Sequence, residues 1–241
     1  MTAPLHCRHA NAGFTLVEMG IVLLIVGLLL AGTMMSLSTQ DDLKRIARTD
    51  ERLAEVREAL IGFAIVNGRL PRPATSLVNG NERAVCATEL DCTGYIPWAL
   101  LGLQRTDGYD NLIRYSVTPA FANAAFTLAT LPSKLVTSRD AAGLVTYLAG
   151  NVPCTLNNGC TPAVIYSTGR RNWGVNLDGI ALGDTSTTNT DEDANNAATV
   201  SFMSRDNSES TTLAGGEFDD RVIWLPAVLL SGRMVQAGRM P

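Results

Sequence analysis

The chain has 241 residues with 23 acidic and 19 basic side chains, a formal net charge of −4 and a pI near 5.2. This balance argues against nucleic-acid binding through a general basic surface. Both histidines, His6 and His9, lie near the start of the chain, so the remainder offers no imidazole for a Ser-His-Asp triad or a His-ligated metal. The sequence also has no phosphate-binding glycine loop. We therefore do not expect an enzyme.

An apolar stretch from residue 14 to residue 37 contains one formal charge, Glu18. About 20 apolar residues suffice for a helix to cross a bilayer, so this pattern predicts a transmembrane helix over 14–37. A carboxylate in such a helix costs roughly 2.5–3.5 kcal/mol near its centre and less near an end, which indicates a specific role for Glu18. The alternative is an ordinary secretory signal peptide, cleaved after Ala31-Gly32, which would release a soluble periplasmic protein.

Residues 13–18, Gly-Phe-Thr-Leu-Val-Glu, and the apolar stretch after them resemble the prepilin cleavage and methylation motif of the type IV pilin superfamily. That superfamily includes the pilins and the pseudopilins of type II secretion. The resemblance implies that residues 1–13 are a leader peptide and that a prepilin peptidase cuts between Gly13 and Phe14. It also implies that the new amine on Phe14 is methylated.

Cleavage at this point would leave a positive amine on Phe14 close to the carboxylate of Glu18. A hydrogen-bonded charge pair costs far less to bury than an unpaired charge. In a staggered helical bundle, Glu18 of one subunit can therefore meet the Phe14 amine of its neighbour and set the subunit register. The alternative is that Glu18 reaches the membrane surface from the helix end and has no partner.

Apolar residues continue at three- and four-residue steps beyond residue 38, with charged residues between them, which is typical of an amphipathic helix. The apolar positions are Leu43, Ile46, Ala47, Leu53, Val56, Leu60, Phe63 and Ala64. Asn67-Gly68 followed by Pro71 supplies a helix stop. We therefore expect one helix over 14–67, whose amphipathic half, within 38–68, packs on a sheet.

Cys7 lies in the expected leader, and the other four cysteines form two pairs with the same spacing. They are Cys86, Cys92, Cys154 and Cys160. The apolar segment implies an oxidising compartment. The simplest interpretation is then two local disulfides, one within each pair. Four cysteines allow three connectivities, and spacing alone does not choose among them. A structural zinc site normally has shorter spacers and a reducing compartment.

Runs of β-branched or aromatic residues bounded by Gly, Pro, Asn or Asp predict strands. The expected strands are residues 112–117, 126–131, 144–148, 163–167, 199–203 and 221–225, and short helices are expected at 95–103 and 226–237. These elements predict an α+β class and a pilin-like fold. Its long N-terminal helix would pack on an antiparallel sheet with elaborated loops, and residues 69–241 would form a periplasmic globular domain.

The segment 183–196 is almost entirely polar and predicts an exposed loop. Its opening resembles a calcium loop, but Asn196 and Phe202 stand where an EF-hand needs glycine and a bidentate glutamate. Major pseudopilins bind calcium in a carboxylate-rich loop, and that resemblance makes five aspartates candidate calcium ligands. They are Asp184, Asp191, Asp193, Asp219 and Asp220. The alternative is a solvated loop in a protein without a cofactor.

Arg170 and Arg171 precede Trp173, a combination that can bind an anionic ligand or stack a DNA base. The other interpretation, which we favour, is a turn at a strand end with a packing tryptophan. Nucleic acid is therefore not an expected partner.

The expected function is that of a minor structural subunit of a type IV pilus or a type II secretion pseudopilus. The resemblance implies other pilin or pseudopilin subunits, a prepilin peptidase, an inner-membrane assembly platform and membrane lipid as partners. It also implies a single-pass inner-membrane protein with a periplasmic C-terminal domain, which moves to a filament or the cell surface after assembly. The alternative function is a tip adhesin or a module that binds DNA or an exported protein.

Overall fold

The computed structural model describes residues 13–240, apart from the side chains of residues 30–38. Most of the expected leader, including Cys7, lies outside the described residues. The chain divides into two compact units, Met1–Lys44 and Arg45–Pro241.

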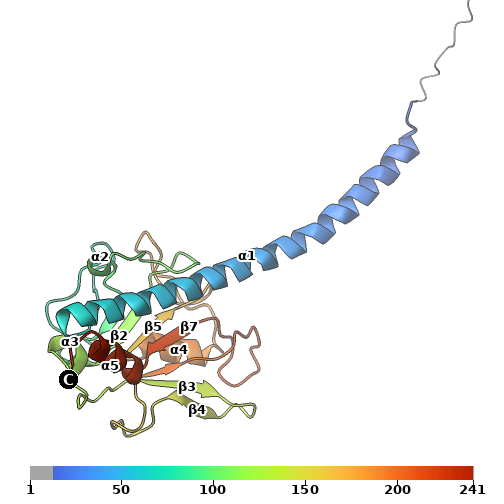
Figure 1. Cartoon of the computed structure of the whole chain (residues 1–241). Helices are drawn as coiled ribbons and strands as arrows, with labels where there is room; N and C mark the ends of the chain where they lie inside the picture. Colours follow the sequence, from blue (N-terminus) through green and yellow to red (C-terminus); the bar gives the residue numbers. More distant parts are fainter. Residues whose placement is uncertain (1–12, 241) are drawn as a thin grey trace, which may run out of the picture. The chain divides into compact units, whose positions relative to one another are not determined.

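One continuous helix, α1 (Leu16–Asn67), contains residues of both units (Figure 1). Its end agrees with the helix stop expected from the sequence. Gly68 takes the left-handed conformation (φ +73°) and donates its N–H to the carbonyl of Ala64 at 2.7 Å. Glycine adopts this conformation without the steric cost of a side chain, which is why it commonly follows the last helical residue.

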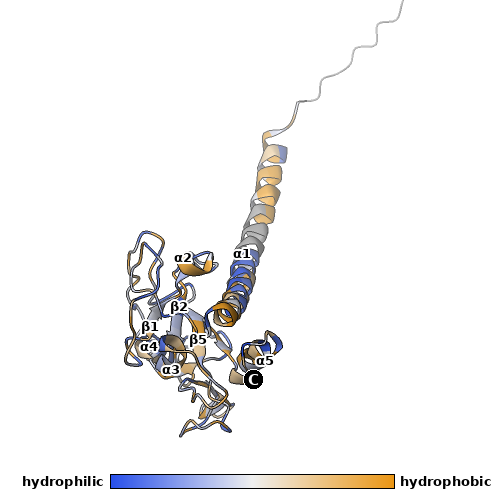
Figure 2. Ribbon diagram, turned by 60° about the vertical axis from the view of Figure 1, so that its left-hand side comes forward, coloured by the Kyte–Doolittle hydropathy of each residue, from blue (hydrophilic) through white to orange (hydrophobic). Residues whose placement is uncertain are grey.

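The expected transmembrane first half of this helix requires a correction. Figure 2 shows hydrophobic residues on the first turns of α1, but the apolar stretch whose side chains are described, 16–29, is shorter than the roughly 20 residues of a membrane-spanning helix. Within the described side chains, no helix combines the length and the hydropathy that a membrane crossing needs. This finding overturns the transmembrane segment 14–37 and, with it, the single-pass inner-membrane localisation.

Two sheets lie in the second unit. The first is antiparallel, in the order β1 (Thr93–Tyr95), β2 (Arg114–Val117), β5 (Ala163–Ser167) and β7 (Arg221–Leu225). The second has the order β4 (Val145–Ala149), β3 (Leu135–Arg139) and β6 (Ser201–Met203). In it β3 pairs antiparallel with β4 but parallel with β6. The α+β class is therefore confirmed, whereas the single antiparallel sheet is replaced by two sheets, one of them mixed.

Four short helices connect or cover these strands. They are α2 (Trp98–Leu101), α3 (Pro119–Asn123), α4 (Thr190–Ala197) and α5 (Ala227–Gln236). The strand expected at 126–131 is wrong. Phe126 instead packs on Phe121, with ring centroids 4.7 Å apart, and a turn follows in which Thr130 donates its N–H to the carbonyl of Thr127.

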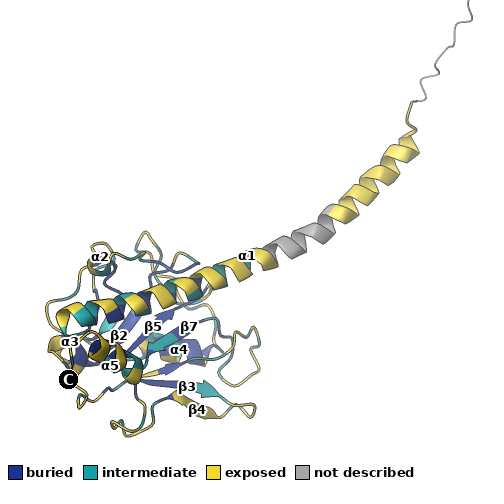
Figure 3. Cartoon of the chain, viewed as in Figure 1, coloured by how far each residue is buried: buried dark blue, intermediate teal, exposed yellow. Residues whose placement is uncertain are grey.

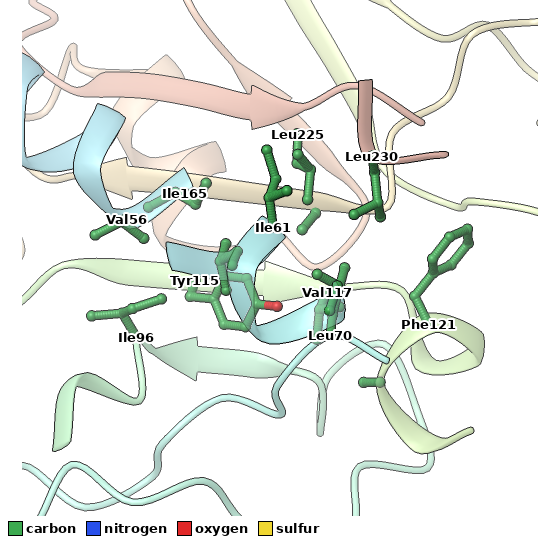
Figure 4. Packing of buried hydrophobic residues seen from close by; sticks show 14 of the residues in the cluster. Val56, Ile61, Leu70, Ile96, Tyr115, Val117, Phe121, Ile165, Leu225 and Leu230 are labelled. Carbon is green, nitrogen blue, oxygen red and sulfur yellow. The ribbon is translucent and has the colours of Figure 1, made fainter. Parts of the chain in front are cut away.

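The second half of α1 packs on the first sheet, as its apolar spacing predicted. Leu53, Leu60 and Ala64 are fully buried, whereas the charged face of α1 is exposed (Figure 3). Figure 4 shows Val56 of α1 in the same cluster as Tyr115 of β2. These contacts form the main core and hold α1 against the four-stranded sheet.

Candidate functional site

The three residues of the expected processing site lie at the start of the described chain. Gly13 is exposed, and a Cβ placed on it would meet no other atom within 4 Å. Phe14 is 73% exposed. Glu18 occupies the first turn of α1, where its N–H donates to Oγ1 of Thr15 at 3.2 Å. A carboxylate in this position is stabilised by the positive end of the helix dipole.

Large apolar side chains surround this first part of α1 on all sides. Leu16 is 92% exposed and Leu28 is 68% exposed. The other exposed members are Phe14, Val17, Met19, Ile21, Val22, Leu23, Leu24, Ile25, Val26 and Leu29. A contiguous apolar surface of this kind usually marks an interaction site.

Both local disulfides expected from the cysteine spacing are present. Cys86 bonds Cys92 and Cys154 bonds Cys160, which leaves none of these four sulfurs as a free thiolate for zinc. Cys86 and Cys92 belong to the main core and are fully buried.

The acidic segment 183–196 is not the exposed loop that its composition suggested, because its second half forms α4, in which Asp191, Glu192 and Asn195 are buried. Asp191 accepts hydrogen bonds from Nε and Nη2 of Arg139 at 2.8 and 2.7 Å. Nε of Arg205 lies 2.8 Å from the same carboxylate. The two guanidinium groups compensate the cost of burying this charge, so the carboxylate of Asp191 is held in a buried ion pair with Arg139 and Arg205.

Of the five candidate calcium ligands, the structure brings only Asp219 and Asp220 together. One oxygen from each of them and one from Glu192 of α4 lie within 4.8 Å of one another. Asp184 instead accepts hydrogen bonds from Ser186 and Asn189, and Asp193 accepts one from the indole N–H of Trp173, at 2.9 Å. Glu192 was not among the expected ligands. The acidic residues after Asn189 and Thr190 are typical of a helix N-terminus. This signal could have predicted that Glu192 lies in a helix and not in an exposed loop.

Hydrogen bonds fix the three carboxyl groups of this cluster. The N–H of Asp219 donates to Oε1 of Glu192 at 2.7 Å, the N–H of Arg171 donates to Oδ2 of Asp219 at 3.2 Å, and Nδ2 of Asn195 donates to Oδ2 of Asp220 at 2.8 Å. Gly169, at φ +66°, makes room for the cluster because a Cβ there would lie 1.9 Å from Oδ1 of Asp219. The cluster thus depends on α4, on the residues before β7 and on the turn after β5.

Burial raises the pKa of Asp219 to about 7, and the nearby charge of Glu192 adds to the shift, while Arg171 opposes it. Burial also raises the pKa of Asp220 well above its ordinary value, against the hydrogen bond from Asn195. Asp219 therefore gains and loses its proton near neutral pH. Chemically, three converging carboxyl groups can bind protons or a hard cation such as calcium.

Substitution Asp219→Asn is expected to remove a pH dependence of stability. The pKa of Asp219 is raised in the folded state, so its contribution is fully present near pH 4 and is lost as the pH rises towards about 7. The free energy of unfolding of the wild type should therefore fall as the pH rises over this window. That of the variant should fall less, so the variant should be the more stable protein at pH 8. Urea unfolding at several pH values measures both, with the exposed Asp178→Asn as a matched control.

A calcium ion is the alternative occupant of this cluster. If calcium raised the melting temperature of the wild type at pH 8, and Asp219→Asn but not Asp178→Asn abolished the rise, the cluster would be a cation site. If neither millimolar calcium nor a chelator changed the melting temperature, the carboxyl cluster would bind protons and not calcium.

The basic pair after β5 lies beside acidic side chains of the same chain. Arg170 and Arg171 both lie near the carboxylate of Glu209, at 3.8 and 3.1 Å, and Arg171 also lies 3.7 Å from Asp219. Trp173 is partly buried and its indole N–H donates to Asp193. This arrangement fits the turn with a packing tryptophan.

Comparisons of this chain with protein-family models, with curated proteins and with solved structures give no match. Function is therefore inferred from residues 13–18 and from the geometry of the two units.

Proposed function

We propose that this chain is a minor structural subunit of a type IV pilus or of a type II secretion pseudopilus. A prepilin peptidase processes it between Gly13 and Phe14, and α1 then joins it to neighbouring subunits. The observation that carries the proposal is the Gly-Phe-Thr-Leu-Val-Glu motif at the start of a long, unbroken helix whose first turns are exposed and apolar.

The exposed apolar side chains support assembly through α1. Burial of apolar surface contributes roughly 25 cal/mol per Å², and side chains such as Leu16, Leu23 and Leu28 are each at least two-thirds exposed in the single chain. Because the apolar residues occupy all sides of the helix, they can pack against several neighbours at once. Several neighbours around each helix are what a helical bundle at the centre of a filament provides.

Glu18 supplies the specificity that apolar packing lacks. It is the only charge in the apolar stretch, and an unpaired charge inside a bundle would be costly. The amine of a processed Phe14 on the adjoining copy would neutralise it. Only one stagger of neighbouring helices brings these two groups together, so the pair selects the register.

Substitution Glu18→Ala is expected to reduce incorporation into filaments about tenfold or more, since the variant leaves the Phe14 amine of a neighbour without a counter-charge. The variant and wild type would be produced in cells that carry the assembly machinery, and the chain would be quantified in sheared filament fractions. Val17→Ala, one residue away and 72% exposed, is the matched control because it keeps the charge.

Mass spectrometry of the same material tests the processing step, and a chain that begins at an N-methylated Phe14 is expected. A mature chain that begins beyond residue 30, or equal incorporation of Glu18→Ala and Val17→Ala, would contradict the proposal. A deletion strain would show whether the chain belongs to a pilus or to a secretion pseudopilus. In it, piliation, protein secretion, surface attachment and DNA uptake would be measured separately.

A further inference from the structure

The outer strand of the second sheet exposes apolar side chains on both of its faces. Four large side chains within five residues are 48% exposed or more: Leu144 66%, Val145 54%, Tyr147 48% and Leu148 50%. Side chains alternate between the two faces of a strand, so Val145 and Tyr147 lie on one face and Leu144 and Leu148 on the other. Thr146, between them, is exposed as well.

The backbone edge of this strand is open too. β4 is the terminal strand in the order β4-β3-β6. Asp140 donates its N–H to the carbonyl of Leu144 at 2.9 Å, and bonding alternates along an antiparallel pair. The polar backbone groups of Leu144 and Thr146 therefore face β3, whereas those of Val145 and Tyr147 face outward.

Charged residues and proline do not protect this edge. Natural sheets block their edges with charged residues, especially lysine, with proline or with a β-bulge. Residues 144–149 contain no charged residue and no proline, and the one register shift of the β3–β4 pair lies near the end of the strand, between Tyr147 and Ala149. A helix or a flat protein surface could cover only one face of β4. Another strand fits this edge better. Its backbone would form hydrogen bonds with the free edge of β4, and its alternating side chains would pack beside those on both exposed faces.

The sequence of this strand is complementary to itself. In an antiparallel pair of two copies centred on Thr146, Leu144 lies opposite Leu148 and Val145 opposite Tyr147. Every pair is apolar except the central Thr146 with its own copy, and Thr–Thr and aromatic–β-branched pairs are favourable across strands. The register also places the outward backbone groups of Val145 opposite those of Tyr147, as an antiparallel ladder requires.

We propose that two copies of this chain pair through β4, antiparallel and centred on Thr146, so that their three-stranded sheets join into one. The contact is isologous, since each copy contributes the same strand. It goes beyond the assembly proposed above because it is a lateral contact of the globular units that does not use α1.

A cysteine at the centre of the pair tests the register. The central residues of this register form a non-hydrogen-bonded pair with Cα atoms about 4.5 Å apart, within the range for a disulfide. In full-length chains carrying Cys7→Ser, Thr146→Cys should form intermolecular disulfides at least about ten times faster than Thr187→Cys under mild oxidation. Thr187 is another exposed threonine, outside the strand. Equal rates for the two variants would overturn the proposal.

Lysine and glutamate at position 146 provide an independent test. Two unfolded variants would not recover association when they are mixed, so recovery shows that both chains are folded. Two Thr146→Lys chains would place like charges opposite one another, as would two Thr146→Glu chains, and each should self-associate at least about tenfold more weakly than wild type. A mixture of the two should recover association, measured by capture of one chain with the tagged other. Thr187→Lys and Thr187→Glu chains share α1 and give the baseline. A mixture that captures no more than this baseline would overturn the proposal.

Discussion

Replacement of Asp191 by alanine is expected to lower the free energy of unfolding by about 3–5 kcal/mol, the usual cost of breaking a buried charge pair from one side. The side chain of Asp191 is 3% exposed and that of Arg205 is 10% exposed. Without the carboxylate, Arg205 and Arg139 would keep two positive charges close together with no counter-charge. Urea unfolding of wild type and variant measures the difference.

The matched control for this prediction is Asp178→Ala, which removes an exposed aspartate and should change stability by less than about 0.5 kcal/mol. If the Asp191 variant lost no more than this control, the two arginines would have found other partners, and α4 would not be held by this ion pair. Such a result would restore the view of 183–196 as a solvated segment.

Replacement of Leu60 by alanine is the second large effect, with an expected loss of about 2–5 kcal/mol. Leu60 is fully buried between α1 and the four-stranded sheet. The substitution removes its transfer free energy and leaves a cavity that the surrounding side chains fill only in part. Thermal and urea unfolding of the full chain would report the loss.

Leu43→Ala, on the same helix, separates packing from helix propensity. Leu43 is 61% exposed, and because alanine is the better helix former this control should be nearly neutral. A similar loss in both variants would mean that the helix itself, and not its contact with the sheet, limits stability.

Local patterns predicted the elements whose burial follows a simple period. The amphipathic half of α1 ends where Asn67-Gly68 indicated, and strands β5 and β7 have the expected bounds. Each of these elements carries its own signal, a three- to four-residue repeat or a bounded run of β-branched and aromatic residues. Two strands were missed because they lack such a signal: β1 contains a glycine, and β3 ends in Ser138 and Arg139.

The acidic segment could not be predicted from local composition, because its partners are remote in sequence. Asp191 is buried through Arg139 of β3, and Asn195 through Met203 and Asp220. A polar segment is normally exposed to solvent. This one is buried because residues distant in the sequence supply its hydrogen bonds and counter-charges. The carboxyl cluster has the same origin, since Glu192 and Asp219 meet only when α4 packs beside the start of β7. The candidate residues Gly13, Phe14 and Glu18, by contrast, were predicted from a contiguous motif.

The last strand and the last helix of the second unit close its main core. β7 pairs with β5 over five residues, and α5 adds the buried Leu230 and Met234. During synthesis these segments leave the ribosome after α1 and β5, so β5 keeps an open edge and the apolar row of α1 lacks part of its cover until residues 221–236 have emerged. A nascent chain therefore exposes apolar surface until β7 and α5 fold onto the core, and such surface is prone to aggregation. A chain truncated before Arg221 would keep this surface exposed.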